Sequence, residues 1–178
     1  SIWNKVFIMA TNLEFIKSAS GTNVSSIDVS DCFSADYDVY KIVIHNVDGY
    51  QSSGNRLVDM RFIDTVPSVI SGSEYDYAVL NLDASNAFSE SRATSTTLIG
   101  RLYAYTNADD FGAVTIYIFN PNDSSSYTFA LYQSSGWLAR NYSAKGIGVH
   151  KSAEQITGVQ FLTNADNMDI DLSVYGVK

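Results

Sequence analysis

Apolar and polar residues alternate with a period of two along most of the chain. Near the C-terminus, single polar or aromatic residues separate the apolar residues Met168, Ile170, Leu172 and Val174. Side chains of a β-strand point alternately to opposite faces, whereas those of a helix repeat every 3.6 residues. The pattern therefore predicts a strand with one buried side and one side that faces solvent.

Similar segments recur along the chain, separated by residues that favour turns. Strands are predicted near residues 13–17, 39–46, 58–63, 75–82, 98–105, 114–119, 127–133, 137–144, 156–162 and 168–175. Asn120-Pro121-Asn122-Asp123 predicts a hairpin, and Ser134-Ser135-Gly136 predicts a turn. Residues 83–96 lack a pattern and are predicted to form a surface loop. Short strands without a helical pattern predict an all-β fold, an antiparallel jelly-roll-like β-sandwich of about ten strands.

The length of 178 residues fits a single domain. We assign residues 13–178 to one β-sandwich domain and residues 1–12 to an apolar N-terminal arm. This arm is either the first strand of the sandwich or an anchor that packs on another protein. Its candidate anchoring residues are Ile2, Trp3, Val6 and Phe7.

The net charge of −8 argues against several partners. An acidic surface repels phosphate, so nucleic acid is not an expected partner. No apolar run approaches the roughly 20 residues that a membrane-spanning helix needs, so no membrane partner is expected either.

Metal ligands are few in this sequence. Cys32, His45 and His150 lack the close spacing of a zinc site, so no metal and no cofactor are predicted. His45 is interpreted as a half-exposed histidine within a strand. A calcium ion in a loop stays an open alternative for residues 164–171 and for Asp109-Asp110 beside Asn107, although solvent-facing carboxylates explain both segments equally simply.

No arrangement of catalytic residues is visible. The only glutamates, Glu14, Glu74, Glu90 and Glu154, are scattered, and no Gly-x-Ser-x-Gly motif occurs. We therefore predict that the protein is not an enzyme and has no catalytic residues, with a glycan-cleaving enzyme as the least favoured alternative.

The 12 tyrosines are the most distinctive part of the composition. A tyrosine ring is apolar while its hydroxyl needs a partner, so tyrosine suits half-buried positions and interfaces. We expect most of them to pack across strands and some to line a contact between subunits. Tyr50 and Trp137, in segments rich in glycine and serine, are the candidate platforms for a bound glycan.

Several segments together resemble a β-rich domain that is widespread in tailed phages, especially those of marine bacteria. The strongest likeness is the strand Tyr37-x-x-Tyr40-Lys41-x-x-x-x-Asn46-Val47, preceded by segments 13–20 and 26–29. The closing segments 156–161 and 172–176 match the usual end of such domains. The likeness covers most of the chain from about Leu13 onward and carries no catalytic signature.

The resemblance implies a structural protein on the exterior of a phage virion, made in the host cytoplasm and placed on the capsid surface or the tail. A capsid knob or decoration protein is favoured over a tail fibre. The implied partners are other virion structural proteins and further copies of the same chain, with a trimer as the expected homo-oligomer. The alternative is a tail-fibre domain that binds receptors, recognising glycans on the host surface.

Overall fold

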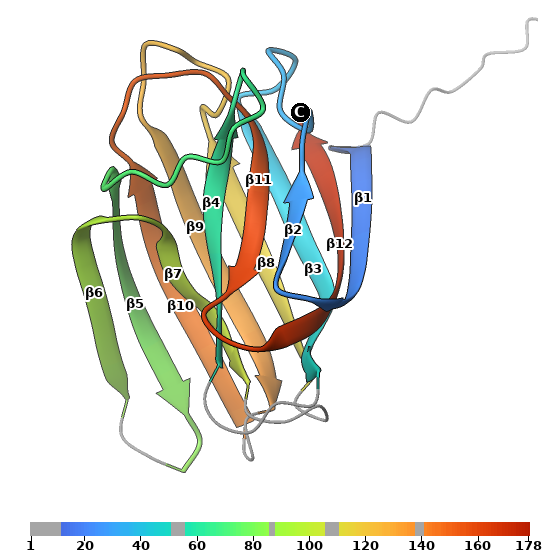
Figure 1. Ribbon diagram of the computed structural model, residues 1–178, viewed down its shortest axis with the longest axis vertical. Coiled ribbons are helices and arrows are strands. Elements are labelled where there is room, and N and C mark those ends of the chain that lie inside the picture. Colours follow the sequence, from blue (N-terminus) through green and yellow to red (C-terminus); the bar gives the residue numbers. More distant parts are fainter. Residues whose placement is uncertain (1–11, 51–55, 86–87, 106–110, 138–140) are drawn as a thin grey trace, which may run out of the picture.

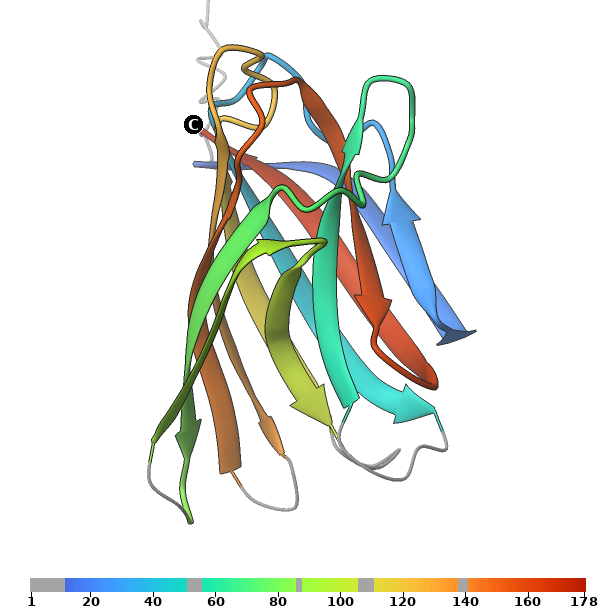
Figure 2. The same ribbon diagram turned by 60° about the vertical axis from the view of Figure 1, so that its left-hand side comes forward.

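A computed structural model describes residues 12–50, 56–85, 88–105, 111–137 and 141–178. These residues form two antiparallel sheets that pack face to face (Figures 1 and 2). The larger sheet contains, in spatial order, β1 (Leu13–Val24), β12 (Asn167–Val177), β3 (Val39–Tyr50), β8 (Gly112–Phe119), β9 (Thr128–Trp137), β10 (Asn141–His150), β5 (Tyr75–Asp83) and β6 (Ser89–Thr96). The smaller sheet contains β2 (Ser26–Val29), β11 (Ile156–Thr163), β4 (Arg56–Asp64) and β7 (Ile99–Tyr105).

The chain passes repeatedly from one sheet to the other, and its last strand, β12, returns to lie between β1 and β3. The predicted all-β antiparallel sandwich is thus confirmed, with twelve strands among the described residues where about ten were expected. No helix occurs in these parts of the chain, and so none that could span a membrane.

The core fills the space between the two sheets, and the period of two explains its composition. On β8, Val114, Ile116 and Ile118 are at most 1% exposed, while the residues between them face outward. The smaller sheet meets them with side chains such as Met60 and Phe161, both fully buried. Residues 1–11, which include the predicted anchoring residues, lie outside the described structure.

Three local predictions were wrong. Residues 137–144, predicted as one strand, are divided between the end of β9 and the start of β10, which pair antiparallel. Residues 89–96, assigned to a loop, form the edge strand β6, which shows no apolar alternation because neither of its faces is deeply buried. Ser134-Ser135-Gly136, assigned to a turn, lies within β9 and pairs with β8. The buried hydroxyl of Ser134 accepts a hydrogen bond from the backbone N–H of Ala144, which stabilises a polar residue inside a strand.

Most of the buried tyrosines pack across strands, as expected. Tyr40, Tyr75, Tyr103 and Tyr132 are at most 1% exposed. Each hydroxyl is hydrogen-bonded; that of Tyr132, for example, donates to the carbonyl of Gly100 at 2.8 Å. Glycines leave room for the rings of Tyr103 and Tyr132, so part of the abundance of tyrosine serves the core itself.

Asp59 supports an irregularity between β4 and β7. The register shifts between Val58 and Met60, and Arg101 on the facing strand adopts a φ of 65°, which is unfavourable for a residue with a side chain. The carboxylate of Asp59 accepts the backbone N–H of Arg101 at 2.7 Å and so stabilises this conformation. Burial raises the pKa of Asp59 above its ordinary value.

The raised pKa predicts how an Asp59→Asn variant responds to pH. A carboxyl with a raised pKa in the folded protein destabilises the fold once it must be charged. This loss of stability is absent below the unfolded pKa of about 3.9 and is complete once the pH has risen through the folded pKa. An asparagine keeps an oxygen acceptor for Arg101 without this cost. We expect Asp59→Asn to melt a few degrees above the wild type at pH 7, with the gain vanishing near pH 3.5. A gain that persists in acid would contradict the assignment.

Candidate functional site

Apolar side chains gather on the outer face of the larger sheet, the face directed away from the smaller sheet. Four of them are exposed although large: Leu80 (43%), Phe129 (45%), Leu131 (39%) and Ile147 (59%). They point outward because the residues that alternate with them, such as Tyr132, fill the core. We call these four residues, together with Ala78, Phe119 and Val149, the outer patch.

Strand register makes the outer patch continuous. Leu131 on β9 lies opposite Tyr117 on β8 and opposite Ile147 on β10, and Ile147 lies opposite Ala78 on β5. A neighbouring row joins Phe119, Phe129 and Val149 in the same way. Since directly opposed side chains lie about 5 Å apart, the patch forms one uninterrupted surface over four strands.

Shallow hollows lie along this face, and they share Leu131 among their lining residues. The most apolar one, of about 530 Å³, lies between Phe129 and Ile147 and extends to Ala93 on β6. A second, of about 450 Å³, follows β8 and β9. A contiguous exposed apolar surface of this kind is typical of an interaction site.

Aromatic and charged side chains continue the face beyond the patch. The ammonium group of Lys41 lies 5.9 Å from the centre of the Tyr117 ring, within the range of a cation–π interaction. At the far edge, Phe15 and Tyr175 form an edge-to-face pair with ring centres 5.9 Å apart. On the opposite side the patch ends at Glu90 and Arg92 of β6, which form an exposed ion pair. The face thus has an apolar centre and a charged rim.

The strands that carry the two candidate glycan platforms end at the same end of the larger sheet. Tyr50 closes β3 and Trp137 closes β9, with only β8 between them. The side chain of Trp137 is 54% exposed. The segment 51–55 that follows Tyr50, and the Tyr50 side chain itself, lie outside the described structure.

The remaining candidates from the sequence have ordinary surroundings. His45 lies on β3, exposed to solvent, and its Nε2 lies 2.9 Å from the hydroxyl of Ser173. Cys32 is buried, which raises the pKa of its thiol to about 12, so the thiol is unreactive at neutral pH.

Two of the three carboxylates of the first calcium candidate already have partners within the chain. Asp166 binds Arg56, and Asp169 accepts the backbone N–H of Asn23 at 2.7 Å. The second candidate, Asp109-Asp110 beside Asn107, lies outside the described residues.

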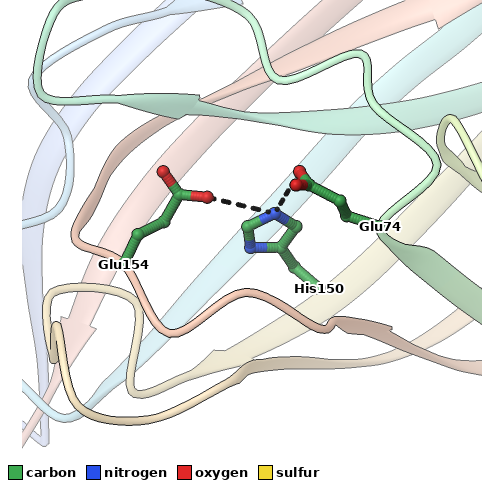
Figure 3. A group of neighbouring side chains, drawn as sticks. All are labelled: Glu74, His150 and Glu154. Carbon is green, nitrogen blue, oxygen red and sulfur yellow. Dashed lines mark hydrogen bonds and ion pairs between the residues drawn. The ribbon is translucent and has the colours of Figure 1, made fainter.

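A cluster that the sequence did not indicate lies at the other end of the sandwich (Figure 3). His150, the last residue of β10, directs its Nε2 atom at Glu74 Oε2 (3.3 Å) and at Glu154 Oε1 (3.5 Å). The histidine is fully buried, and the two glutamates are 44% and 36% exposed. Ligand atoms of all three lie within 4.8 Å of one another. These residue types are able to bind a metal ion.

Long-range folding forms this cluster, which is why sequence spacing gave so little sign of it. Glu74 lies 76 positions before His150 and is brought there by the pairing of β5 with β10. The one local signal is the spacing of four residues between His150 and Glu154. On a helix this spacing places two ligands on one face, but here it spans the connection from β10 to β11.

No protein-family model and no curated protein matches this chain. Among solved structures it is similar to a β-fructofuranosidase from Schwanniomyces occidentalis complexed with fructosyl-erythritol, with 8% identity, a TM-score of 0.29, and coverage of 95% of this chain but 35% of that one. It is also similar to a family 7 alginate lyase A1-II' variant in complex with substrate, with 9% identity, a TM-score of 0.29, and coverage of 80% of this chain and 62% of that one. For the CBM2 module of an evolved Dit protein of Lactobacillus casei BL23 phage J-1, the identity is 7% and the TM-score is 0.19. The match covers 89% of this chain and 76% of that one. At these TM-scores the similarities carry no inference about function.

Proposed function

We propose that this chain is a non-enzymatic structural protein of the exterior of a phage virion, which assembles by pairing its outer patch with that of a second copy. The observation that carries the proposal is the outer patch itself. Its exposed members Phe129, Leu131 and Ile147 are not covered by any residue that the structure describes. Covering them with a partner removes apolar surface from water at a gain of about 25 cal/mol per Å².

A second copy fits this surface better than a glycan does. Sugar hydroxyls need hydrogen-bond partners, and the row of Phe119, Phe129 and Val149 offers none, although Gln133 and Lys145 border Leu131 and Ile147 on the same face. Two sheet faces, in contrast, pack at about 10 Å with their apolar rows interdigitated. The eight-stranded face is about 34 Å wide, and strands of eight to twelve residues make it about 25–40 Å long. An interface of the standard size, roughly 800 Å² per partner, therefore needs most of this face and not only the four strands of the outer patch.

The contact of one face with the same face of another copy has twofold symmetry and gives a dimer. This arrangement replaces the trimer expected from the family resemblance. The resemblance in segments such as 33–47 still supports the setting on a virion, where a small β-domain is held by contacts between proteins. The acidic character of the chain suits an exterior protein that stays soluble and does not bind packaged nucleic acid.

Placing a charge in the outer patch tests the assembly. We expect the wild type to sediment as a dimer and Ile147→Asp to sediment as a monomer, with dimerisation weakened by about 100-fold because the contact would remove the new carboxylate from water, a cost that Lys145 and Arg92 in the same hollow offset only in part. The side chain of Ile147 is 59% exposed, so the melting temperature should change little. Analytical ultracentrifugation over a range of concentrations gives both masses.

Val66→Asp is the matched control, because Val66 is 77% exposed and lies away from the outer patch. It should remain a dimer. A monomeric wild type, or an Ile147→Asp variant that dimerises like the control, would overturn the assembly. If a glycan array instead shows binding that Trp137→Ala abolishes, the receptor-binding alternative takes its place.

The proposed location on the exterior of a virion is tested separately. An antibody against this chain should label the exterior of particles purified from the phage that encodes it, and imaging would distinguish head from tail. Particles that contain no copy of the chain would refute the virion role while leaving the dimer contact unaffected.

A further inference from the structure

We infer that Glu74, His150 and Glu154 form a binding site for one divalent transition-metal ion of the Zn²⁺ type. The inference is independent of the proposed function, because the three side chains lie at the end of the sandwich and line neither of the hollows of the outer patch described above.

The distances within the cluster are long for hydrogen bonds and suitable for a shared ion. A strong N–H···O bond to a carboxylate is about 2.7–2.9 Å long, and one Nε2 atom carries at most one proton to share between two carboxylates. The observed separations are 3.3 Å to Glu74 and 3.5 Å to Glu154. Bonds of about 2.0–2.1 Å from a tetrahedral zinc ion place two of its ligands about 3.4 Å apart. The spacing around Nε2 therefore matches two edges of such a tetrahedron.

The charges of the cluster also favour a cation. Among the described residues, neither Glu74 nor Glu154 forms an ion pair with a lysine or an arginine. Lys151, the next residue after His150, is instead paired with Asp76 at 2.7 Å. Two carboxylates thus meet at one imidazole nitrogen without a lysine or an arginine paired to either of them, and a divalent ion bound to all three would balance both negative charges.

The histidine is held in position before any ion binds. It is fully buried, with its ring centre 5.0 Å from that of Tyr75 and 6.1 Å from that of Phe62. The backbone N–H of Lys151 donates to the carbonyl of Glu74 at 2.7 Å, which fixes the two segments relative to each other. An immobile imidazole with two half-exposed carboxylates around it combines a rigid ligand with two that can adjust.

A second, independent observation comes from the opposite side of the ring. His150 Nδ1 is buried without a hydrogen-bond partner, and so is Thr128 Oγ1. The two residues are directly opposed on β10 and β9, so their Cβ atoms lie about 5 Å apart. When Nε2 binds a metal, Nδ1 must carry the ring proton, and metal-binding histidines usually donate that proton to an oxygen. Thr128 Oγ1 and Nδ1 are not bonded to each other in this structure, and this hydroxyl is the oxygen that would take the proton once a metal is bound.

The ligand types select the ion. Imidazole with carboxylates suits zinc and similar transition metals, whereas calcium and magnesium prefer oxygen ligands alone. Three protein ligands leave a further coordination position for water. The ion would join the start of β5, the end of β10 and the connection to β11, three segments that are distant in the sequence.

Calorimetry on the full chain, freed of metal with a chelator and titrated with zinc chloride, tests the site. We expect one Zn²⁺ per chain, and at 100-fold excess over the dissociation constant a rise of the melting temperature by about 5 °C or more. Glu74→Gln and Glu154→Gln should each weaken binding by more than about 10-fold, because each removes a charged ligand. Both glutamates are partly exposed, so these variants should remain folded. Co²⁺ in place of Zn²⁺ should produce the visible absorption of a tetrahedral site.

Glu90→Gln and His45→Ala are the matched controls, since they remove an exposed glutamate and the other histidine of the chain. Both should bind zinc like the wild type. The inference is overturned if the wild type binds no zinc at concentrations up to about 1 mM, because a specific site would have a dissociation constant well below that concentration. It is equally overturned if the two ligand variants bind as the controls do, or if His45→Ala abolishes binding.

Discussion

Gly146→Ala is expected to destabilise the protein by about 3 kcal/mol, although glycine to alanine is usually neutral or favourable within a strand. A Cβ atom at residue 146 would lie 2.2 Å from Cζ and 2.3 Å from the hydroxyl oxygen of Tyr132. The ring has little space to move, because it is 1% exposed and its hydroxyl is bonded to the carbonyl of Gly100. Urea unfolding at pH 7, followed by circular dichroism, measures the loss.

Gly72→Ala is the control for this substitution. Its Cβ would lie 3.3 Å from the end of the Glu74 side chain, which is partly exposed and can shift. We expect a change within about 0.5 kcal/mol. Equal effects of the two substitutions would show that the tyrosine ring does not determine the cost at Gly146.

Tyr75→Phe is expected to cost about 2–3 kcal/mol through the loss of a single oxygen atom. The hydroxyl of Tyr75 accepts the buried backbone N–H of Phe62 and donates to the carbonyl of Ile70, both at 3.0 Å. These bonds join β4 to the segment that leads into β5. Removing the oxygen leaves a buried N–H without a partner, which costs more than an average hydrogen bond contributes. The difference in free energy of unfolding in urea is the measurement.

Tyr127→Phe serves as the comparison, because Tyr127 is 46% exposed and water can replace any bond that its hydroxyl loses. Its stability should remain within about 0.5 kcal/mol of the wild type. A Tyr75→Phe variant as stable as Tyr127→Phe would mean that the N–H of Phe62 finds another partner.

The outer patch shows where reasoning from the sequence stops. The strand prediction over 127–133 was correct, but Phe129-Ala130-Leu131-Tyr132 is apolar on both of its alternating faces. Nothing local says whether Phe129 and Leu131 or Ala130 and Tyr132 face the core. The structure places Tyr132 inside because a glycine on β10 leaves room for its ring, and Leu131 is exposed as a consequence.

The cluster at His150 shows a second limit. Its glutamates are scattered in the sequence, and two of the four, Glu74 and Glu154, come together only when β5 pairs with β10. In the sequence, His45 and His150 looked equivalent as possible metal ligands, since neither has another ligand at close spacing. Burial distinguishes them: His45 faces solvent, whereas His150 is enclosed by aromatic rings.

The sequence by itself determined that the protein is an all-β antiparallel sandwich, because the alternation of apolar and polar residues is a local property that each strand shows independently. Turn chemistry likewise placed the hairpin at Asn120-Pro121-Asn122-Asp123, where Asn120 adopts a φ of 54°. Only the tertiary structure decided which strands are neighbours, which apolar face stays uncovered, and which carboxylates surround His150. These properties depend on pairing between distant segments, and the sequence of a single strand does not specify its partner.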